Sequence, residues 1–177
     1  MTNPLLTEIE RYRPELPLAE ACTPPASWYI DPRFLDLELE TTFARSWQYA
    51  CRLDQVSAPG QFVTLELAGE PLLVVRGNDG VLRGFFNVCR HHAAAVMTEA
   101  AGCVKRLRCP YHGWTYTLEG TLKAAPAFEG VQNFDSAANS LVPVTTAAWE
   151  NWVFVRIAPE GPSLEEFLGP EVIPQIS

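Results

Sequence analysis

The chain lacks several features that would place it in a class at once. It has only three histidines and two methionines in 177 residues, and no apolar run approaches the roughly 20 residues that a membrane-spanning helix needs. Acidic residues outnumber basic ones by 21 to 13, the formal net charge is -8, and no basic run is present. Binding to nucleic acid or insertion into a membrane is therefore not expected.

A secretory signal is also missing from the N-terminus. The opening MTNPLLTEIERYRPELPLAEA has no basic region followed by an apolar core. We therefore expect a reducing, cytoplasmic location. In that setting, five cysteines favour metal binding or plain burial over a disulfide framework.

The composition and the turn signals predict a mainly β fold. Hydrophobic residues make up 47% of the chain, and its 15 prolines and 11 glycines favour many short elements joined by turns. The strongest hairpin signal is Asn78-Asp79-Gly80 between two β-rich runs. Alternating patterns predict strands or hairpins over residues 61–67, 71–88, 103–109, 113–124 and 151–159.

The sequence patterns at the two ends of the chain differ from the strand patterns of its central part. Residues 1 to about 27 are rich in proline and predict an extended arm, followed by a short helix with Asp31 as its N-cap and Pro32 in its first turn. Ser163 and Glu166 form a capping-box pattern that predicts a second short helix, ending at Gly169. We expect an N-terminal arm and helix over 1–45, a central domain over 46–160 and a helical tail over 161–177.

Every histidine of the chain lies near two cysteines. Cys89 and His91 form a C-x-H step, and after 17 residues Cys109 and His112 form a C-x-x-H step. Each step lies in a predicted loop beside a predicted hairpin, so the two loops could close over one site. This pattern predicts a metal centre.

Two kinds of metal centre compete for this ligand set. Zinc accepts two cysteines and two histidines, but zinc fingers usually pair like with like along the chain. A [2Fe–2S] cluster of Rieske type needs two thiolates on one iron and two imidazoles on the other. Because each loop offers one cysteine and one histidine, the interleaving favours iron–sulfur.

The motif C-x-H, 17 residues, C-P-Y-H-G-W-x-Y resembles that of the Rieske [2Fe–2S] domain of ring-hydroxylating (Rieske non-haem iron) oxygenase α subunits. The resemblance extends to PPASWYIDPRFLDLELETTFARSWQYACRLDQV and ENWVFVRI, and so covers the chain from about residue 16. It implies a Rieske fold of antiparallel sheets with a cluster-binding subdomain of two loops. It also implies that Cys89, His91, Cys109 and His112 bind the cluster.

Departures from related patterns are informative. Respiratory Rieske proteins carry a disulfide over the cluster, but Ala94 and Tyr111 occupy the corresponding positions here. Their serine after the H-G step is replaced by Trp114, while Tyr116 keeps a phenol that could reach a cysteine sulfur. Fewer hydrogen bonds to sulfur predict a potential toward the low end of the Rieske range.

The first loop departs from the family in a second way. It reads C-R-H-H-A where the family often has C-R-H-R-G. His92 and Ala93 therefore replace an arginine and a glycine. His92 is a rival ligand, although the C-x-H spacing favours His91.

An oxygenase of this family also needs a mononuclear iron(II), held by two histidines and a carboxylate. Only His92 is left over, so we expect that iron only in a downstream catalytic domain absent from these 177 residues. The resemblance then implies one-electron transfer from a ferredoxin or flavin reductase to that domain. It also implies an aromatic or small organic substrate, including quaternary ammonium compounds, and a possible homotrimer. A free-standing Rieske carrier and a structural zinc module are the alternatives.

Overall fold

The structure is a computed structural model that describes residues 4–128 and 130–176. The chain forms two compact units, with the boundary between Thr42 and Phe43. None of the helices in the described part of the chain has both the length and the apolar character needed to cross a bilayer.

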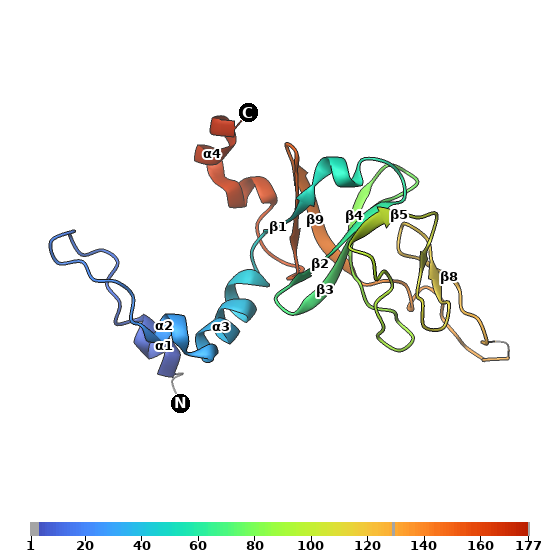
Figure 1. The fold of residues 1–177 in the computed structure, drawn as a ribbon, viewed down its shortest axis with the longest axis horizontal. Coiled ribbons are helices and arrows are strands. Elements are labelled where there is room, and N and C mark those ends of the chain that lie inside the picture. The colour runs from blue at the N-terminus through green and yellow to red at the C-terminus, as the bar shows by residue number, and fades with distance from the viewer. Residues whose placement is uncertain (1–3, 129, 177) are drawn as a thin grey trace. The chain divides into compact units, whose positions relative to one another are not determined.

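The first unit is helical. It contains α1 (Pro4–Ile9), α2 (Ser27–Ile30) and α3 (Pro32–Glu38), and a π-helical turn over Leu39–Phe43 follows α3 (Figure 1). The Asp31 side chain accepts a hydrogen bond from the Arg33 backbone N–H at 3.0 Å, which satisfies one free donor of the first turn. The predicted short helix and its cap are thus confirmed.

The prediction of an extended arm up to residue 27 is wrong at α1. Pro4 is the first residue of this helix, where its missing N–H costs nothing and its fixed φ suits a helical turn. Leu5 and Ile9 are four residues apart and share one face of the helix, and Leu5 is buried. The prolines were therefore weaker evidence against a helix than their number suggested.

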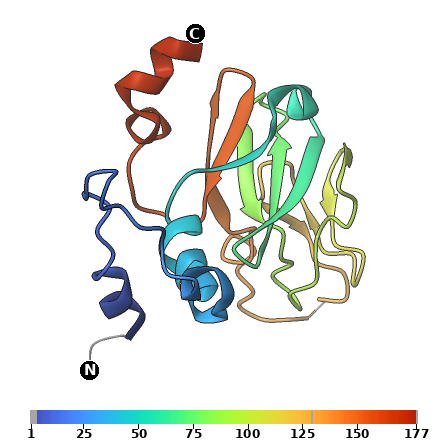
Figure 2. The same cartoon turned by 60° about the vertical axis from the view of Figure 1, so that its left-hand side comes forward.

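The second unit contains a seven-stranded antiparallel sheet, which confirms the mainly β prediction. The strand order is β1-β10-β9-β4-β3-β2-β5. In Figure 2 the long β9–β10 hairpin, in orange, lies beside the green strands of the same sheet. The strands are β1 (Gln48–Arg52), β2 (Gln61–Leu67), β3 (Glu70–Arg76), β4 (Leu82–Phe86), β5 (Ala101–Cys103), β9 (Pro143–Trp149) and β10 (Trp152–Arg156), with a 3-10 turn, η2, over Leu53–Val56.

A small sheet of three strands carries the second motif loop. Its order is β6 (Leu107–Arg108), β7 (Thr115–Tyr116) and β8 (Leu122–Ala124). It lies on the side of the larger sheet where β4 and β5 are found (Figure 1). Both predicted hairpins are confirmed, and Gly80 (φ 76°) and Gly120 (φ 89°) supply the left-handed residues of their turns.

The predicted single strand over 103–109 is wrong. The chain pairs with β2 up to Cys103, leaves that sheet, and pairs with β7 from Leu107. Val104 donates its backbone N–H to the Gly60 carbonyl at 2.9 Å as it departs. Residues 103–109 do alternate, but the first residue of the segment pairs in the larger sheet and the last ones pair in the smaller sheet.

Two hydrophobic clusters form the core of the second unit. One lies between the sheets and contains Phe62, Phe85, Leu107, Trp114 and Tyr116 among its buried members. The other packs β1, β9 and β10 against β2 and β3 around Val56, Val74, Val153 and Val155. The first cluster also includes both motif cysteines, so the core of the fold and the floor of the candidate site are continuous.

The last helix, α4 (Leu164–Ile176), begins as predicted. Ser163 donates its backbone N–H to Glu166 Oε2 at 2.8 Å, and Glu166 returns its own N–H to Ser163 Oγ at 3.2 Å. Gly169 (φ 76°) leaves the helical conformation as expected, but helix resumes after it. Gly169, where the helix was predicted to end, is therefore the position of a kink, because Pro170 can start a new helical turn.

Candidate metal centre

The first motif loop joins β4 to β5 and is closed by its own backbone. The Cys89 N–H donates to the Ala94 carbonyl at 2.8 Å, and the Ala93 N–H donates to the Cys89 carbonyl at 3.0 Å. This turn requires a left-handed residue, and Ala93 adopts φ 57°. A glycine would adopt that conformation without strain.

A buried asparagine fixes the base of this loop. Asn87 Oδ1 accepts hydrogen bonds from the N–H groups of Val96 (3.1 Å) and Met97 (2.9 Å), and its Nδ2 donates to the Met97 carbonyl at 2.8 Å. Sequence reasoning missed this residue. The available signal was a polar side chain inside the apolar run FFNVC, which must find partners if it is buried.

The second motif loop joins β6 to β7 and repeats the same backbone pattern. The Cys109 N–H donates to the Trp114 carbonyl at 2.9 Å, and the Gly113 N–H donates to the Cys109 carbonyl at 3.1 Å. Gly113 has φ 76°, matching Ala93 in the first loop. The two loops are therefore the same turn made twice, with a cysteine at its first position and a left-handed residue at its fifth.

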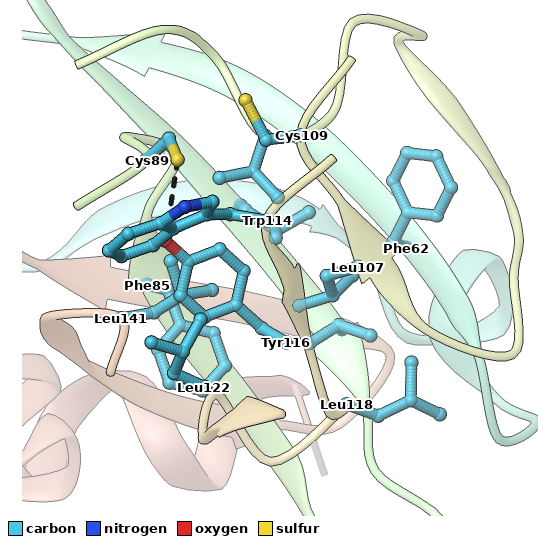
Figure 3. Close-up of a cluster of buried hydrophobic side chains, with 13 residues drawn as sticks. Phe62, Phe85, Cys89, Leu107, Cys109, Trp114, Tyr116, Leu118, Leu122 and Leu141 are labelled. Carbon is cyan, nitrogen blue, oxygen red and sulfur yellow. Dashed lines mark hydrogen bonds between the residues drawn. The ribbon is translucent and has the colours of Figure 1, made fainter. Parts of the chain in front are cut away.

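The two cysteines form the buried side of the site. Cys89 and Cys109 are only 3% and 2% exposed, and both belong to the hydrophobic cluster between the sheets. Figure 3 shows the two thiols at one edge of that cluster, close to Trp114 and Tyr116. Burial raises the pKa of the Cys109 thiol, and the neighbouring Cys89 adds to this, while the backbone N–H groups of Tyr111 and His112 oppose it.

Tyr116 connects the two loops. From β7, behind the second loop, its hydroxyl lies 3.4 Å from Cys89 Sγ (the dashed line in Figure 3) and accepts the Arg90 backbone N–H at 3.0 Å. Burial raises the pKa of this phenol, as does its contact with Cys89. Because the phenol keeps its proton and its oxygen already accepts from Arg90, it is placed to donate to the sulfur.

The imidazoles form the outer side of the site. One ligand atom from each of His91, His92 and His112 lies within 4.8 Å of the other two. His91 is half-buried, whereas His92 and His112 are exposed. Burial, followed by the two neighbouring imidazoles, lowers the pKa of His91 and favours its neutral, metal-binding form.

Aromatic rings fix the directions of these imidazoles. His91 stacks on Trp114 with 4.8 Å between ring centroids and an angle of 3°, and Tyr111 stacks on His112 at 3.9 Å. Phe128 packs on both His91 and Trp114, at 5.8 and 5.2 Å. Phe128 was not anticipated, because nothing in its local sequence brings it back to the loops.

This donor set fits an iron–sulfur cluster of Rieske type. His91 Nδ1 is buried and has no hydrogen-bond partner, a costly state that a metal ion would relieve. Two buried thiols lie on one side and the imidazoles on the other, the division that two irons with different ligands require. Of the three remaining cysteines, Cys51 lies in the second core cluster, Cys103 is exposed on β5, and Cys22 is exposed in the first unit.

Comparison with known proteins agrees with this geometry. Residues 46–135 match the family described as the Rieske [2Fe-2S] domain. Choline monooxygenase of Arabidopsis thaliana is 37% identical over 153 residues, and the carnitine monooxygenase oxygenase subunit of Escherichia coli K12 is 37% identical over 149 residues. These alignments cover 86% and 84% of this chain but only 35% and 40% of the relatives.

Solved structures give the same result. The apo form of the quaternary ammonium Rieske monooxygenase CntA superposes with a TM-score of 0.82 at 30% identity, over 88% of this chain and 45% of that chain. Naphthalene 1,2-dioxygenase from Rhodococcus sp. gives a TM-score of 0.86 at 28% identity, over 95% of this chain and 38% of that one.

The chain belongs to the Rieske [2Fe–2S] domain family. Within that family it is homologous to the Rieske domains of oxygenase subunits, and its fold is the Rieske fold that the sequence predicted. The cofactor of such domains is the Rieske [2Fe–2S] cluster, and the mononuclear iron of these oxygenases belongs to their catalytic domain.

Proposed function

We propose that Cys89, His91, Cys109 and His112 hold a Rieske [2Fe–2S] cluster through which the chain passes one electron at a time. The observation that carries the proposal is the matched pair of loops, which puts two buried thiols on one side of the site and imidazoles on the other. When bound, the cluster supplies a reversible one-electron couple.

The chain's own residues define the path of the electron. The thiols are covered by the hydrophobic cluster, so water is kept from the sulfur side. His112 is exposed and His91 half-exposed, so electrons cross the protein surface on the imidazole side. Because His91 Nδ1 is the buried, unpaired nitrogen, it is the atom that would bind the cluster, and Nε2 would then keep a proton.

We assign the chain to an oxygenase α subunit whose catalytic domain carries the mononuclear iron. The relatives named choline, carnitine and glycine betaine monooxygenase favour a small quaternary ammonium substrate over an aromatic one. The substrate pocket would lie in the catalytic domain, so this assignment is tested with the full-length subunit, by product analysis on choline, carnitine and naphthalene. A homotrimer and a reducing, cytoplasmic location belong to the same proposal.

Charge around the loops supports an acidic electron donor, either a ferredoxin or a flavin reductase. In a chain of net charge -8, four exposed cations lie in or beside the motif loops: Arg90, Lys105, Arg106 and Arg108. Such a local reversal of charge steers an oppositely charged partner to the site. The rate of reduction by an acidic donor should therefore fall as ionic strength rises.

The ligand assignment is tested by metal analysis together with EPR spectroscopy. We expect the purified chain to contain iron and sulfide in equal amounts and to give a Rieske-type EPR signal only after reduction by dithionite. Cys109→Ser should abolish the signal, whereas Cys103→Ser, a matched change at an exposed cysteine outside the site, should leave it intact.

The alternatives give different results. A colourless protein that binds one zinc through its cysteines and takes up no cluster when reconstituted with iron and sulfide would move the chain to the structural class and refute the electron-transfer proposal. A free-standing carrier would show the same EPR signal. It would differ in exchanging electrons with separate donor and acceptor proteins without any covalently attached catalytic domain.

A further inference from the structure

His92 occupies the position in the first loop that His112 occupies in the second. Both loops make the same pair of backbone hydrogen bonds, counted from Cys89 and from Cys109. His92 and His112 are each three residues after the cysteine and directly precede the left-handed residue. The repeated turn therefore directs a third imidazole to the site, in addition to the two proposed to bind the cluster.

The three imidazoles converge without the thiols. Ring centroids are 3.9 Å apart for His91 and His92, 4.8 Å for His91 and His112, and 5.3 Å for His92 and His112. Within the part of the chain that the structure describes, neither thiol joins this group of ligand atoms. Cys89 and Cys109 are buried, whereas two of the imidazoles are exposed to any ion in solution.

We propose that, before its cluster is inserted, the chain binds a divalent transition metal of the zinc class through His91, His92 and His112. Three imidazoles form the protein ligand set of open zinc sites, and water would take the fourth position on the exposed side. Imidazole also suits copper and nickel. Tetrahedral zinc needs nitrogens roughly 3.3 Å apart, so the exposed His92 and His112 rings must close in by small side-chain rotations.

This site would compete with cluster assembly, because both use His91 and His112. It requires His92, which the proposed cluster does not. His92 therefore separates the two functions, and one substitution distinguishes them.

The test uses the apo-chain with Zn²⁺, followed by calorimetry, and with Co²⁺ as a spectroscopic substitute. We expect one ion per chain, and His92→Gln should weaken binding by about tenfold or more. Glu99→Gln, at an exposed carboxylate of the same loop, is the matched control and should bind normally. The Co²⁺ complex should show d–d bands without a thiolate-to-cobalt charge-transfer band.

Two results would overturn the proposal. One is unchanged metal affinity in His92→Gln, and the other is a strong thiolate-to-cobalt band, which would place the ion on the cysteines. After reconstitution with iron and sulfide, His92→Gln should still give the Rieske EPR signal; loss of the signal would contradict the separation of the two sites. If no variant, nor the parent chain, takes up a cluster while zinc binding still depends on His92, the proposed electron-transfer function fails and this inference stands.

Discussion

At the scale of single residues, Tyr116 both packs in the core and contacts the first motif loop. Its ring fills the core between the two sheets, and its hydroxyl contacts both Cys89 and the backbone of Arg90. Trp114, on the same strand-loop segment, supports His91 by stacking. Neither side chain is a proposed ligand, yet together they position Cys89 and His91, the two proposed ligands of the first loop.

Replacing Tyr116 with phenylalanine should lower the reduction potential of the cluster. The phenol is placed to donate to Cys89 Sγ, and such a bond stabilises the more negative, reduced state. A loss of about 1 kcal/mol corresponds to about 40 mV in a one-electron couple. Redox titration followed by EPR would measure the shift. Tyr111→Phe, which keeps the ring stacked on His112, is the control, and an equal shift in both variants would contradict the role of the Tyr116 hydroxyl.

Deprotonation of the Cys51 thiol in the unfolded chain should lower the free energy of unfolding at alkaline pH. Burial, with a smaller contribution from Asp54, raises the pKa of this thiol from 9.0 to about 11. Below pH 9 the thiol is protonated in both the folded and the unfolded chain and has no effect. Between pH 9 and 11 only the unfolded chain loses the proton, so the free energy of unfolding decreases across that window. Urea denaturation of the parent and of Cys51→Ala from pH 8 to 11 should show a steeper decline for the parent; parallel curves would argue against the shift.

At the scale of elements, the two motif loops adopt the same backbone turn but have different residues at its left-handed position. Gly113 meets the left-handed requirement at no cost, while Ala93 meets it with strain. The sequence had marked Ala93 as a departure from the family pattern, and the structure gives that departure a physical consequence. The two motif loops therefore differ in the conformational strain of their backbones.

Ala93→Gly should stabilise the first loop, and Gly113→Ala should destabilise the second. Relief of a left-handed alanine is offset by the greater flexibility of glycine in the unfolded chain, so we expect a net gain of about 0.5 kcal/mol for Ala93→Gly. The reverse change at Gly113 should cost about 1 kcal/mol or more, because an added Cβ would also lie 3.3 Å from the Arg108 guanidinium. Urea unfolding of the apo-chain measures both. Ala95→Gly, at a residue without positive φ, is the control and should destabilise.

At the scale of the whole molecule, both core clusters and both motif loops belong to the unit formed by residues 43–177. The C-terminal part of that unit is held by hydrogen bonds to other residues of the same unit. Arg156 is buried, and its Nε donates to the Ala158 carbonyl at 3.0 Å while the Trp47 indole donates to Pro162 at the same distance. The unit thus contains its own stabilising contacts as well as the whole candidate site.

A chain that begins at residue 43 should therefore fold and bind the cluster. We expect the same reduced EPR signal and a free energy of unfolding within about 1 kcal/mol of the full chain, which corresponds to a change in Tm of about 3 °C. EPR and thermal melting monitored by circular dichroism would measure these. Loss of cooperativity in the shortened chain would show that residues 1–42 are part of the same folding unit.

The sequence by itself predicted the mainly β fold, both hairpins, the caps at Asp31 and Ser163, and the family. The hairpins, the caps and the two Cys–His steps were predictable because turn glycines, capping side chains and short residue spacings act within a few residues. The single strand predicted over 103–109 was wrong, because the two ends of this segment pair with strands of different sheets. The extended arm was wrong at Pro4–Ile9, because a helix forms there within a proline-rich stretch.

Only the tertiary structure decided what the loops have in common. It showed that they repeat one backbone turn, that Asn87 and Tyr116 fix the first loop, and that Phe128 returns to contact His91. It also brought His92 to the other two imidazoles, a relation that C-x-H spacing did not indicate. The contacts of Tyr116, Phe128 and His112 with the first loop join residues far apart in the chain, so they form only once the two sheets have packed. The repeated turn is local, but residue types alone do not specify its backbone path.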